Sequence, residues 1–574
     1  MTLRLSLYKA FPLLLAMVSV ALAKPDHATA QIGWAEPWRD AVVVTAEERA
    51  TNAGLEILEQ GGNAVDAAVA VQFSLAVTLP RAGNIGGGGF MVVHMADGTR
   101  AALDFREKAP AKAHRDMFLD PNGEYVPERS RRGPLASGVP GVVAGMTQAL
   151  ERFGTMPLNQ VLQPAIRLAR EGYPLSHTQA SELNSAAGSL SEFEASREYF
   201  VRSDGREWAK GDLFIQEELA RTLERIAKDG REGFYGGETA RLIADQMERT
   251  GGWITAEDLA NYHAQWRVPV QSRWNGYELL MMPPPSSGGI VVKQILGMSD
   301  SFDLASMGHN SADYIHTLSE IMRRSFADRN HFLGDPDFSE IPLDYLGRDT
   351  YLRDRMSSFD PDHASTSEEI THGDPYPVKE SDETTHYSIL DGEGSAVSIT
   401  TTLNGSFGSM MSVAGAGFLL NNEMDDFTSK PGEANMFGLV EGEANTIEPG
   451  KRMLSSMTPT LVLRDGSVRA VLGAAGGPRI ITATIQTFLN LTLFDMNARE
   501  AMNAPRFHHQ WLPDRIWLEA YAGTADTQRI LEERGHLVDR RGTVGRVHLI
   551  WVDEEGDRYV VPDPRGDGYG AGLD

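Results

Sequence analysis

The strongest constraint on the fold is a hairpin pattern two-thirds of the way along the chain. The segments Thr384–Leu390 and Ser395–Leu403 are rich in β-branched residues, and the glycine-rich run Asp391–Gly394 separates them. Segments of this kind pair as neighbouring antiparallel strands when a short turn joins them. The chain is therefore expected to build a sheet around this hairpin.

The length of the hairpin loop decides which side chains meet across the two strands. A three-residue loop, with Gly394 in the left-handed bulge position, places Thr384 opposite Thr402 and puts Asn404 on the same face. A two-residue loop would shift the register by one residue, place Thr401 opposite Thr384, and turn Thr402 to the other face. We predict the three-residue loop.

Other segments predict helices and strands that alternate along the chain. Thr45 and Glu48 form the pattern of a capping box, which predicts a helix that begins there and ends near Gly61. Further helices are predicted at 63–77, 311–330, 482–490 and 526–534. Strands are predicted at 41–44, 458–463, 468–472 and 547–552, and two more strands are predicted to end at residues 94 and 105. Strands flanked by helices indicate a layered body of mixed α and β structure.

The first 23 residues predict a secretory signal peptide. Arg4 and Lys9 precede the apolar stretch Ala10–Ala21, and Ala21-Leu22-Ala23 has the small residues of a cleavage site. The alternative is a membrane anchor, but a spanning helix needs about 20 apolar residues. We therefore expect export, cleavage, and a mature protein without a stable membrane span.

Composition narrows the possible chemistry and the compartment. The chain has 574 residues, no cysteine and a formal net charge of -26. Thiol catalysis and thiolate metal sites are excluded, and the negative charge disfavours nucleic acid as a partner. An exported protein without disulfides has to be stabilised by core burial. Together with the bacterial-looking motifs quoted below, this favours the periplasm, although secretion into the medium stays open.

The boundary between Glu383 and Thr384 has the features of a self-cleavage site. A segment rich in Ser, Asp, Glu and Pro precedes it, and the predicted strand begins at Thr384. A threonine hydroxyl needs a neighbouring base to act as a nucleophile. Cleavage would supply one, because the new α-amino group of Thr384 has a pKa of about 7.7–8.0.

Several longer motifs resemble the γ-glutamyltransferase (glutathione hydrolase) family, from about Gly33 to the C-terminus. The motifs are Thr384–Ser388, Asn421–Phe427, Arg452–Met457, Gly476–Arg479, Asp104–Glu107 and Pro505–His509. The resemblance implies an α+β fold, the four-layer αββα sandwich of N-terminal-nucleophile hydrolases. It also implies that the precursor cuts itself into a large chain, 24–383, and a small catalytic chain, 384–574, which stay together as a heterodimer within one fold.

The resemblance assigns the catalytic roles to four residues. Thr384 would attack the γ-carbonyl group of a γ-glutamyl donor, and Thr402 would orient Thr384. The backbone N–H groups of Gly476 and Gly477 would form the oxyanion hole. Taken alone, Thr402 is an ordinary strand residue and the glycines are an ordinary turn before proline.

A γ-glutamyl group carries an α-carboxylate and an α-ammonium on one carbon, so its pocket needs donors and acceptors side by side. By the resemblance, Arg106, Ser455 and Ser456 would bind the carboxylate. The ammonium would be bound by Asn404, Glu423 and Asp426. Without the resemblance, the two acidic residues would be read as a solvated face.

Three other features complete the prediction. The segment 431–442 matches a lid loop over the pocket, in which Phe437 can shield the site but cannot offer a hydroxyl to Asn404. The adjacent pair His508-His509 is interpreted as packing, because neighbouring strand residues point to opposite faces. No metal or other cofactor is expected, since the nucleophile, base and oxyanion donors all come from the chain.

The resulting hypothesis is an exported enzyme that cleaves glutathione and other γ-glutamyl compounds and passes the glutamyl group to water, an amino acid or a dipeptide. One alternative is a cephalosporin acylase of the same superfamily, against which Glu423 and Asp426 argue. The other is an uncleaved, non-enzymatic protein that binds γ-glutamyl compounds or acts as a scaffold.

Overall fold

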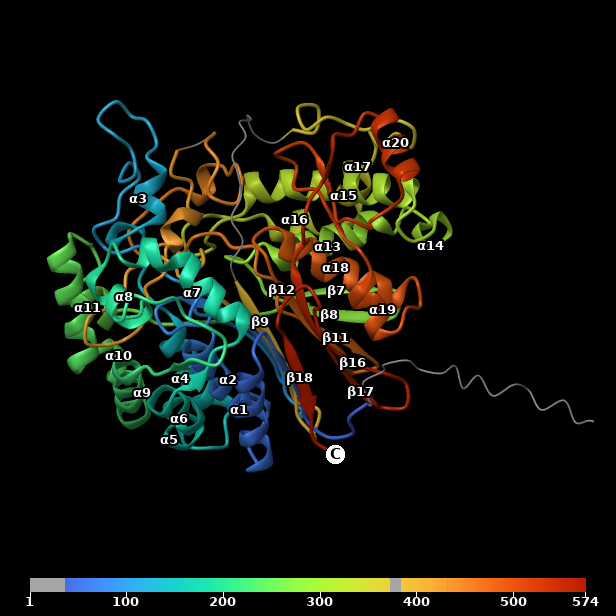
Figure 1. Ribbon diagram of the computed structural model, residues 1–574. Coiled ribbons are helices and arrows are strands. Elements are labelled where there is room, and N and C mark those ends of the chain that lie inside the picture. Colours follow the sequence, from blue (N-terminus) through green and yellow to red (C-terminus); the bar gives the residue numbers. More distant parts are fainter. Residues whose placement is uncertain (1–36, 372–383, 431) are drawn as a thin grey trace, which may run out of the picture. The chain divides into compact units, whose positions relative to one another are not determined.

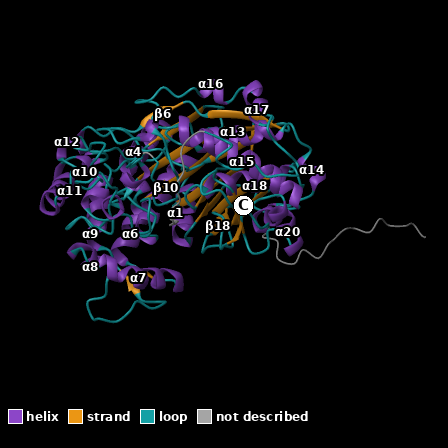
Figure 2. Cartoon of the chain, turned by 90° about the horizontal axis from the view of Figure 1, so that it is seen from above, coloured by secondary structure: helices purple, strands orange, loops and turns teal. Residues whose placement is uncertain are grey.

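The computed structural model describes residues 37–371, 384–430 and 432–574. Two β-sheets face each other at the centre of this body, and helices cover the outer face of each sheet (Figures 1 and 2). This is the predicted four-layer αββα arrangement of the α+β class, and the expectation is confirmed.

The first sheet has seven strands in the order β18-β1-β9-β10-β2-β3-β6. Its strands are β1 (Val42–Thr45), β2 (Gly88–His94), β3 (Arg100–Asp104), β6 (Gln265–Arg267), β9 (Thr385–Leu390), β10 (Ala396–Thr402) and β18 (Tyr569–Gly572). All neighbours pair antiparallel. The central strands β9 and β10 are the predicted hairpin.

The second sheet has six strands in the order β17-β16-β12-β11-β8-β7. Its strands are β7 (Val270–Trp274), β8 (Tyr277–Met281), β11 (Thr460–Arg464), β12 (Ser467–Ala475), β16 (Arg546–Val552) and β17 (Arg558–Pro562). Smaller sheets are formed by β4 (Tyr173–Pro174) with β5 (Leu213–Phe214), and by β13 (Phe507–His508), β14 (Ile516–Leu518) and β15 (Val538–Arg540).

One helical layer covers the seven-stranded sheet, where α2 (Ala64–Thr78) contacts β9 and β10, and α4 (Val142–Phe153) contacts β3. The same half of the chain holds α1 (Glu48–Glu59), α3 (Pro127–Arg131), η1 (Pro134–Ala136), α5 (Leu158–Val161), α6 (Gln163–Glu171), α7 (His177–Leu190), α8 (Glu194–Phe200), α9 (Glu217–Asp229), α10 (Glu232–Tyr235), α11 (Gly237–Thr250) and α12 (Ala256–Ala260).

The other helical layer covers the six-stranded sheet, where α18 (Arg479–Thr492) contacts β12 and α13 (Gly288–Ser299) contacts β7. The long helix α15 (Ala312–Phe332) packs on α13. The remaining elements are α14 (Leu304–Met307), α16 (Leu343–Leu346), α17 (Asp349–Arg355), η2 (Glu423–Asp426), η3 (Glu443–Asn445), α19 (Ala498–Asn503) and α20 (Ala525–Glu533).

The hairpin has the predicted three-residue loop. The N–H of Asp391 donates to the carbonyl of Ser395 at 3.0 Å, and Gly394 has a φ of 96°. Thr385 is the partner of Thr401. In this antiparallel register, the residue before Thr385, which is Thr384, faces the residue after Thr401, which is Thr402. The register prediction is confirmed, and it rests on a backbone conformation that glycine adopts without strain.

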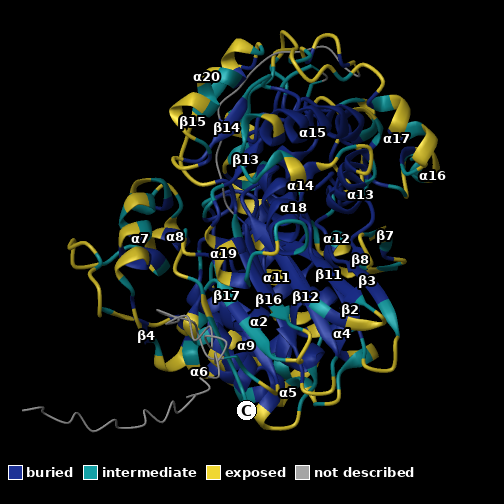
Figure 3. Cartoon of the chain, turned by 90° about the vertical axis from the view of Figure 1, so that its right-hand side faces the viewer, coloured by how far each residue is buried: buried dark blue, intermediate teal, exposed yellow. Residues whose placement is uncertain are grey.

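Alternate residues of the central strands enter different cores. Val43 and Ile389 join the apolar cluster beneath the first helical layer, whereas Val42, Val44 and Leu390 join the cluster that includes the second sheet and its helices. This follows from the two-residue period of a strand. Figure 3 shows the strands as buried, while exposed positions gather on outer helices such as α7, α17 and α20.

The capping-box prediction at Thr45 is wrong. Thr45 is the last residue of β1, and the N-cap of α1 is Glu47, whose carboxylate accepts from the N–H groups of Arg49 and Ala50. A longer acidic side chain fills the role that sequence spacing gave to the hydroxyl. The other predicted helices and strands are present, with ends that differ by a few residues.

No helix within residues 37–371, 384–430 and 432–574 is both long and apolar enough to cross a membrane. The predicted signal peptide, residues 1–23, and the predicted cleavage residue Glu383 lie outside the described part of the chain.

Candidate active site

Thr384 lies immediately before β9, at the end of the central hairpin, and is only 5% exposed. It lines two cavities. One is small, about 20 Å³, and the other is about 530 Å³.

The small cavity gathers most of the predicted site residues from segments far apart in sequence. Its walls include Arg106, Thr384, Thr402, Asn404, Glu423, Asp426, Phe437, Ser455, Ser456 and Gly477. Of the described residues predicted for the site, Gly476 alone is not part of its lining. The prediction for Gly476 therefore depends on its backbone position beside Gly477.

Thr402 and Asn404 hold the turn that follows β10. The Thr402 hydroxyl accepts from the N–H of Asn404 at 2.7 Å, and Asn404 has a φ of 72°. The side-chain amide of Asn404 donates to the carbonyl of Asn422 at 3.0 Å. A left-handed residue at this point redirects the chain, so that Asn404 reaches the cavity together with Thr402.

Arg106 is completely buried and forms ion pairs with both predicted ammonium-binding acids. Its Nη2 lies 2.5 Å from Asp426 Oδ2, and its Nη1 donates to Glu423 Oε1. Its Nε and Nη2 also donate to the carbonyl groups of Met453 and Leu454, at 3.2 Å each. The guanidinium is thus held in one orientation in the wall of the cavity that Thr384 also lines.

The carboxylates of the site crowd one another in a dry environment. Burial raises the pKa of Glu423 well above its usual range and also raises the pKa of Asp426, while Arg106 opposes both shifts. Glu423 Oε2 and Asp426 Oδ1 are buried and have no hydrogen-bond partner. The cavity therefore holds two carboxylate oxygens that lack a donor.

Two residues of the small cavity, Arg329 and Glu441, were not indicated by the sequence. Arg329 on α15 donates from Nη2 to Ser456 Oγ at 3.3 Å and pairs with Glu441. Both Arg329 and Glu441 line the small cavity. The sequence predicted a helix at 311–330, but a charged residue on a helix normally faces solvent, so the sequence held no signal for Arg329.

Gly476 and Gly477 form the turn between β12 and α18. Gly477 has a φ of 55°, and a Cβ atom at this position would lie 2.7 Å from the Phe437 ring. Glycine fits this turn without strain, and the turn places the Gly477 N–H just before the start of a helix, where the backbone attracts negative charge.

Phe437 is 5% exposed and packs against Gly477, as the lid prediction requires of a shielding aromatic. Its N–H donates to the side chain of Asn435 at 3.0 Å, and its carbonyl accepts from Gln510 at 3.3 Å. The residues Asn435, Phe437, Leu439 and Glu441 together form one wall of the small cavity.

The histidines near the site are buried and hydrogen-bonded to neighbouring side chains. His386 is buried between the sheets, where its ring nitrogens bond to Thr400 and Ser388 at 2.9 and 3.0 Å. Burial lowers its pKa well below the usual range. His508 and His509 bond to different partners, Thr482 and Asp514. Among the described residues, no group of three or more His, Cys, Asp or Glu side chains could hold a metal ion.

Comparison with known proteins matches the chain to a family model and to named relatives. The family model described as gamma-glutamyltranspeptidase matches residues 50–573. The glutathione hydrolase proenzyme of Escherichia coli (strain K12) is 46% identical over 528 residues, which cover 92% of this chain and 90% of that protein.

Solved structures that align with the chain include an acylase and a gamma-glutamyltranspeptidase. A cephalosporin acylase from Bacillus halodurans aligns with a TM-score of 0.83 at 27% identity, over 93% of this chain and 96% of the other. A chain of the Helicobacter pylori gamma-glutamyltranspeptidase aligns with a TM-score of 0.56 at 45% identity, over 57% of this chain and 93% of that chain.

Proposed function

The chain belongs to the γ-glutamyltranspeptidase family of enzymes, and we propose that it is a self-processing glutathione hydrolase that also transfers γ-glutamyl groups to amino acids or peptides. The observation that carries this proposal is the small cavity at Thr384. There a buried guanidinium and two carboxylate oxygens without donors lie side by side. An α-carboxylate and an α-ammonium on one carbon need this combination.

Cleavage between Glu383 and Thr384 would turn Thr384 into an N-terminal residue. Its hydroxyl oxygen then attacks the γ-carbonyl carbon while its own α-amino group takes the hydroxyl proton. The amine leaving group receives that proton as the C–N bond breaks, which leaves a γ-glutamyl ester on Thr384. Water or an amine acceptor attacks this ester and restores the free hydroxyl.

The roles of the neighbours follow from their positions. The N–H groups of Gly476 and Gly477 would stabilise the oxyanion, and the loss of one such donor typically raises the barrier by about 3–4 kcal/mol. Thr402 would orient Thr384 across the hairpin. All of these groups belong to the chain, so the reaction as proposed needs no cofactor.

Substrate entry requires rearrangement. A free volume of about 20 Å³ holds about one water molecule. A γ-glutamyl group enters only if Phe437 and its neighbours move and Arg106 exchanges Glu423 and Asp426 for the substrate carboxylate. Ser455 and Ser456 would complete that carboxylate site, while the released acids and Asn404 bind the ammonium.

The sheet topology supports a heterodimer of two products, 24–383 and 384–574. In the seven-stranded sheet, β9 and β10 of the later segment lie between β1 and β2 of the earlier one. In the six-stranded sheet, β11 pairs with β8. Cutting one connection leaves these ladders in place, so the products would stay together as one fold. Export to the periplasm is proposed on the predicted signal peptide alone.

The test compares wild type with Thr384→Ala by intact mass and by turnover of a chromogenic γ-glutamyl anilide. Two fragments that meet at Glu383/Thr384, with activity in the wild type alone, are expected. A wild type that stays whole and inactive would overturn self-processing and favour a binding protein.

Acylase activity is the second candidate, because the similar structure from Bacillus halodurans is that of a cephalosporin acylase. A glutaryl anilide has the same chain length as the γ-glutamyl donor but lacks the α-ammonium. Cleavage of the precursor with glutaryl turnover above γ-glutamyl turnover would establish this alternative. The donor-free oxygens of Glu423 and Asp426 predict the opposite order.

A further inference from the structure

Arg329 lines the small cavity but has no role in the reaction described so far. Its side chain is 1% exposed, and Nε, Nη1 and Nη2 all have partners. Nε donates to Ser287 Oγ at 3.1 Å, while Nη1 donates to Asn330 Oδ1 at 2.8 Å and pairs with Glu441. Nη2 donates to Ser456 Oγ at 3.3 Å. Ser456 is one of the two serines proposed to bind the α-carboxylate of the substrate.

The bond from Arg329 fixes the role of the Ser456 hydroxyl. An arginine side chain has donors but no acceptor and stays charged in proteins, so Ser456 Oγ accepts in this bond. A hydroxyl group has one hydrogen and two lone pairs. With a lone pair used toward Arg329, the Ser456 hydrogen points to another partner, and a carboxylate in the cavity is a strong acceptor for it.

The turn that carries Ser456 is held in place from two sides. Arg106 Nη2 donates to the carbonyl of Leu454 at 3.2 Å. The N–H and the hydroxyl of Ser287 both donate to the carbonyl of Ser455, at 2.8 and 2.7 Å. Because the backbone of this turn is fixed, the partner of a hydroxyl on it decides where that hydroxyl points.

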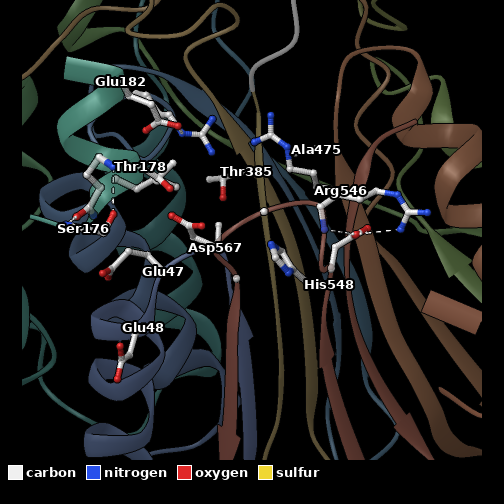
Figure 4. A pocket seen from close by; sticks show the side chains of 18 of the residues that line it. Glu47, Glu48, Ser176, Thr178, Glu182, Thr385, Ala475, Arg546, His548 and Asp567 are labelled. Carbon is white, nitrogen blue, oxygen red and sulfur yellow. Dashed lines mark hydrogen bonds and ion pairs between the residues drawn. The ribbon is translucent and has the colours of Figure 1, made fainter. Parts of the chain in front are cut away.

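Arg329 lies at the small cavity and not at the larger one. Among the described residues, Thr384 alone lines both cavities. Figure 4 shows the larger cavity, with Glu182, Thr385 and Arg546 in its walls. A change at Arg329 should therefore affect binding of the γ-glutamyl group and leave the larger cavity intact.

We propose that Arg329 is a positioning residue for the α-carboxylate of the substrate, because it makes the Ser456 hydroxyl a dedicated donor to that carboxylate. The inference rests on the proposed function and deepens it, since it identifies what makes one of the two serines selective. Arg106 would contact the carboxylate directly, whereas Arg329 acts on it through Ser456. Without Arg329, the Ser456 hydroxyl can turn to other acceptors, and selectivity for the carboxylate falls.

The experiment compares two donors on the processed enzyme, a γ-glutamyl anilide and a γ-aminobutyryl anilide. The second donor has the same chain length and the same amino group but lacks the α-carboxylate. The quantity measured is the ratio of kcat/KM for the first donor to kcat/KM for the second, called the carboxylate preference below. A general loss of folded enzyme cancels in this ratio.

Arg329→Gln offers the Ser456 hydroxyl an amide oxygen that can accept its hydrogen. It should lower the carboxylate preference by about 10-fold or more, mainly through a higher KM for the γ-glutamyl anilide. Arg329→Lys again presents a charged donor without an acceptor and should restore part of the preference. In a Ser456→Ala background, Arg329→Gln should have little further effect, because residues that act through one hydroxyl are not additive.

Arg324→Gln is the matched control on the same helix. Arg324 is buried like Arg329 and pairs with Glu320 at 2.6 Å, but it does not line the small cavity. Its replacement should lower the melting temperature and leave the carboxylate preference unchanged. This control separates the loss of a buried guanidinium from the loss of the bond to Ser456.

A second comparison applies if Arg329→Gln does not fold or is not processed. The double variant Arg329→Gln/Glu441→Gln removes both charges of the pair, so neither is left buried without its counter-charge. It is compared with Glu441→Gln, which keeps Arg329 beside Ser456. The double variant should lose the carboxylate preference and the single variant should keep it. An equal preference in both would overturn the inference.

The outcomes separate the inference from the proposed function. A preference that Ser456→Ala lowers and Arg329→Gln leaves unchanged would overturn the inference alone. A full effect of Arg329→Gln in the Ser456→Ala background would do the same. A processed wild type that releases no anilide from the γ-glutamyl donor would overturn the proposed function itself, and the role of Arg329 with it.

Discussion

Arg329 Nη1 lies 2.5 Å from Glu441 Oε1, and both side chains are almost completely buried. Arg329 belongs to α15, whereas Glu441 ends the wall that begins at Asn435 and includes Phe437. This ion pair therefore connects segment 435–441, which forms one wall of the small cavity, to the helical layer that contains α15.

Removing one partner of this pair should destabilise segment 435–441 at the small cavity. Glu441→Gln or Arg329→Met leaves a buried charge without its counter-charge, which costs about 3–5 kcal/mol when no other partner is available. We expect a lower melting temperature and a higher donor KM in each single variant. The double variant Arg329→Met/Glu441→Gln should recover part of the stability, and simple additivity of the two losses would contradict the coupling.

Asp426 should govern selectivity for the α-ammonium. Asp426→Asn removes a charged acceptor, and hydrogen bonds to charged groups are worth about 1.5–3 kcal/mol, or roughly 10-fold to 100-fold. We expect kcat/KM for a γ-glutamyl anilide to fall by this factor, with a smaller change for the glutaryl anilide. Asp425→Asn is the control for the loss of a neighbouring carboxylate, because Asp425 bonds to Tyr125, Ser130 and the N–H of Met436 instead. Equal losses on both donors would refute the assignment.

Thr402 should act through its hydroxyl. Thr402→Val keeps the β-branched shape but loses the acceptor for the Asn404 N–H, which lies 2.7 Å away. A misplaced nucleophile can cost about 100-fold in rate. We expect kcat of the processed fraction to fall by about that factor, whereas Thr402→Ser stays within a few-fold of the wild type. Equal activity of the two variants would show that the hydroxyl has no role.

Glu107 gives a prediction about pH and stability. Both carboxylate oxygens of Glu107 are buried without hydrogen-bond partners, and burial raises its pKa to about 7, against the effect of Arg106. An unfolded glutamate titrates near 4.3. Between about pH 4.3 and 7 the folded state holds a proton that the unfolded state has lost, so this group lowers stability as the pH rises.

Glu107→Gln should therefore gain stability relative to its parent as the pH rises from 5 to 8, by an amount on the order of 1–3 kcal/mol. The measurement is the melting temperature of the Glu107→Gln variant and of its parent. Both carry Thr384→Ala, which keeps each protein uncut. The exposed control Glu443→Gln should show no such trend. A stability difference that is independent of pH would mean that Glu107 is ionised in the fold throughout this range.

Local rules were sufficient where the chain contacts its own near neighbours. The register of the β9–β10 hairpin followed from Gly394 and from the parity of strand positions, and the structure agrees. The capping box at Thr45 failed because the strand continued through that residue and Glu47 reached the free N–H groups instead. Pairing in the sheet overrode a pattern that spacing alone favoured.

By itself, the sequence determined the place of Thr384 on the central hairpin, the family motifs and the layered fold, because these depend on short-range patterns and residue types. Only the tertiary structure decided that Arg106 is paired with Glu423 and Asp426, that Arg329 and Glu441 close the small cavity, and that a second cavity opens at Thr384. These contacts join residues that lie from 112 to 320 positions apart in the sequence. No local pattern encodes which buried charges come to neutralise one another when two sheets and two helical layers pack together.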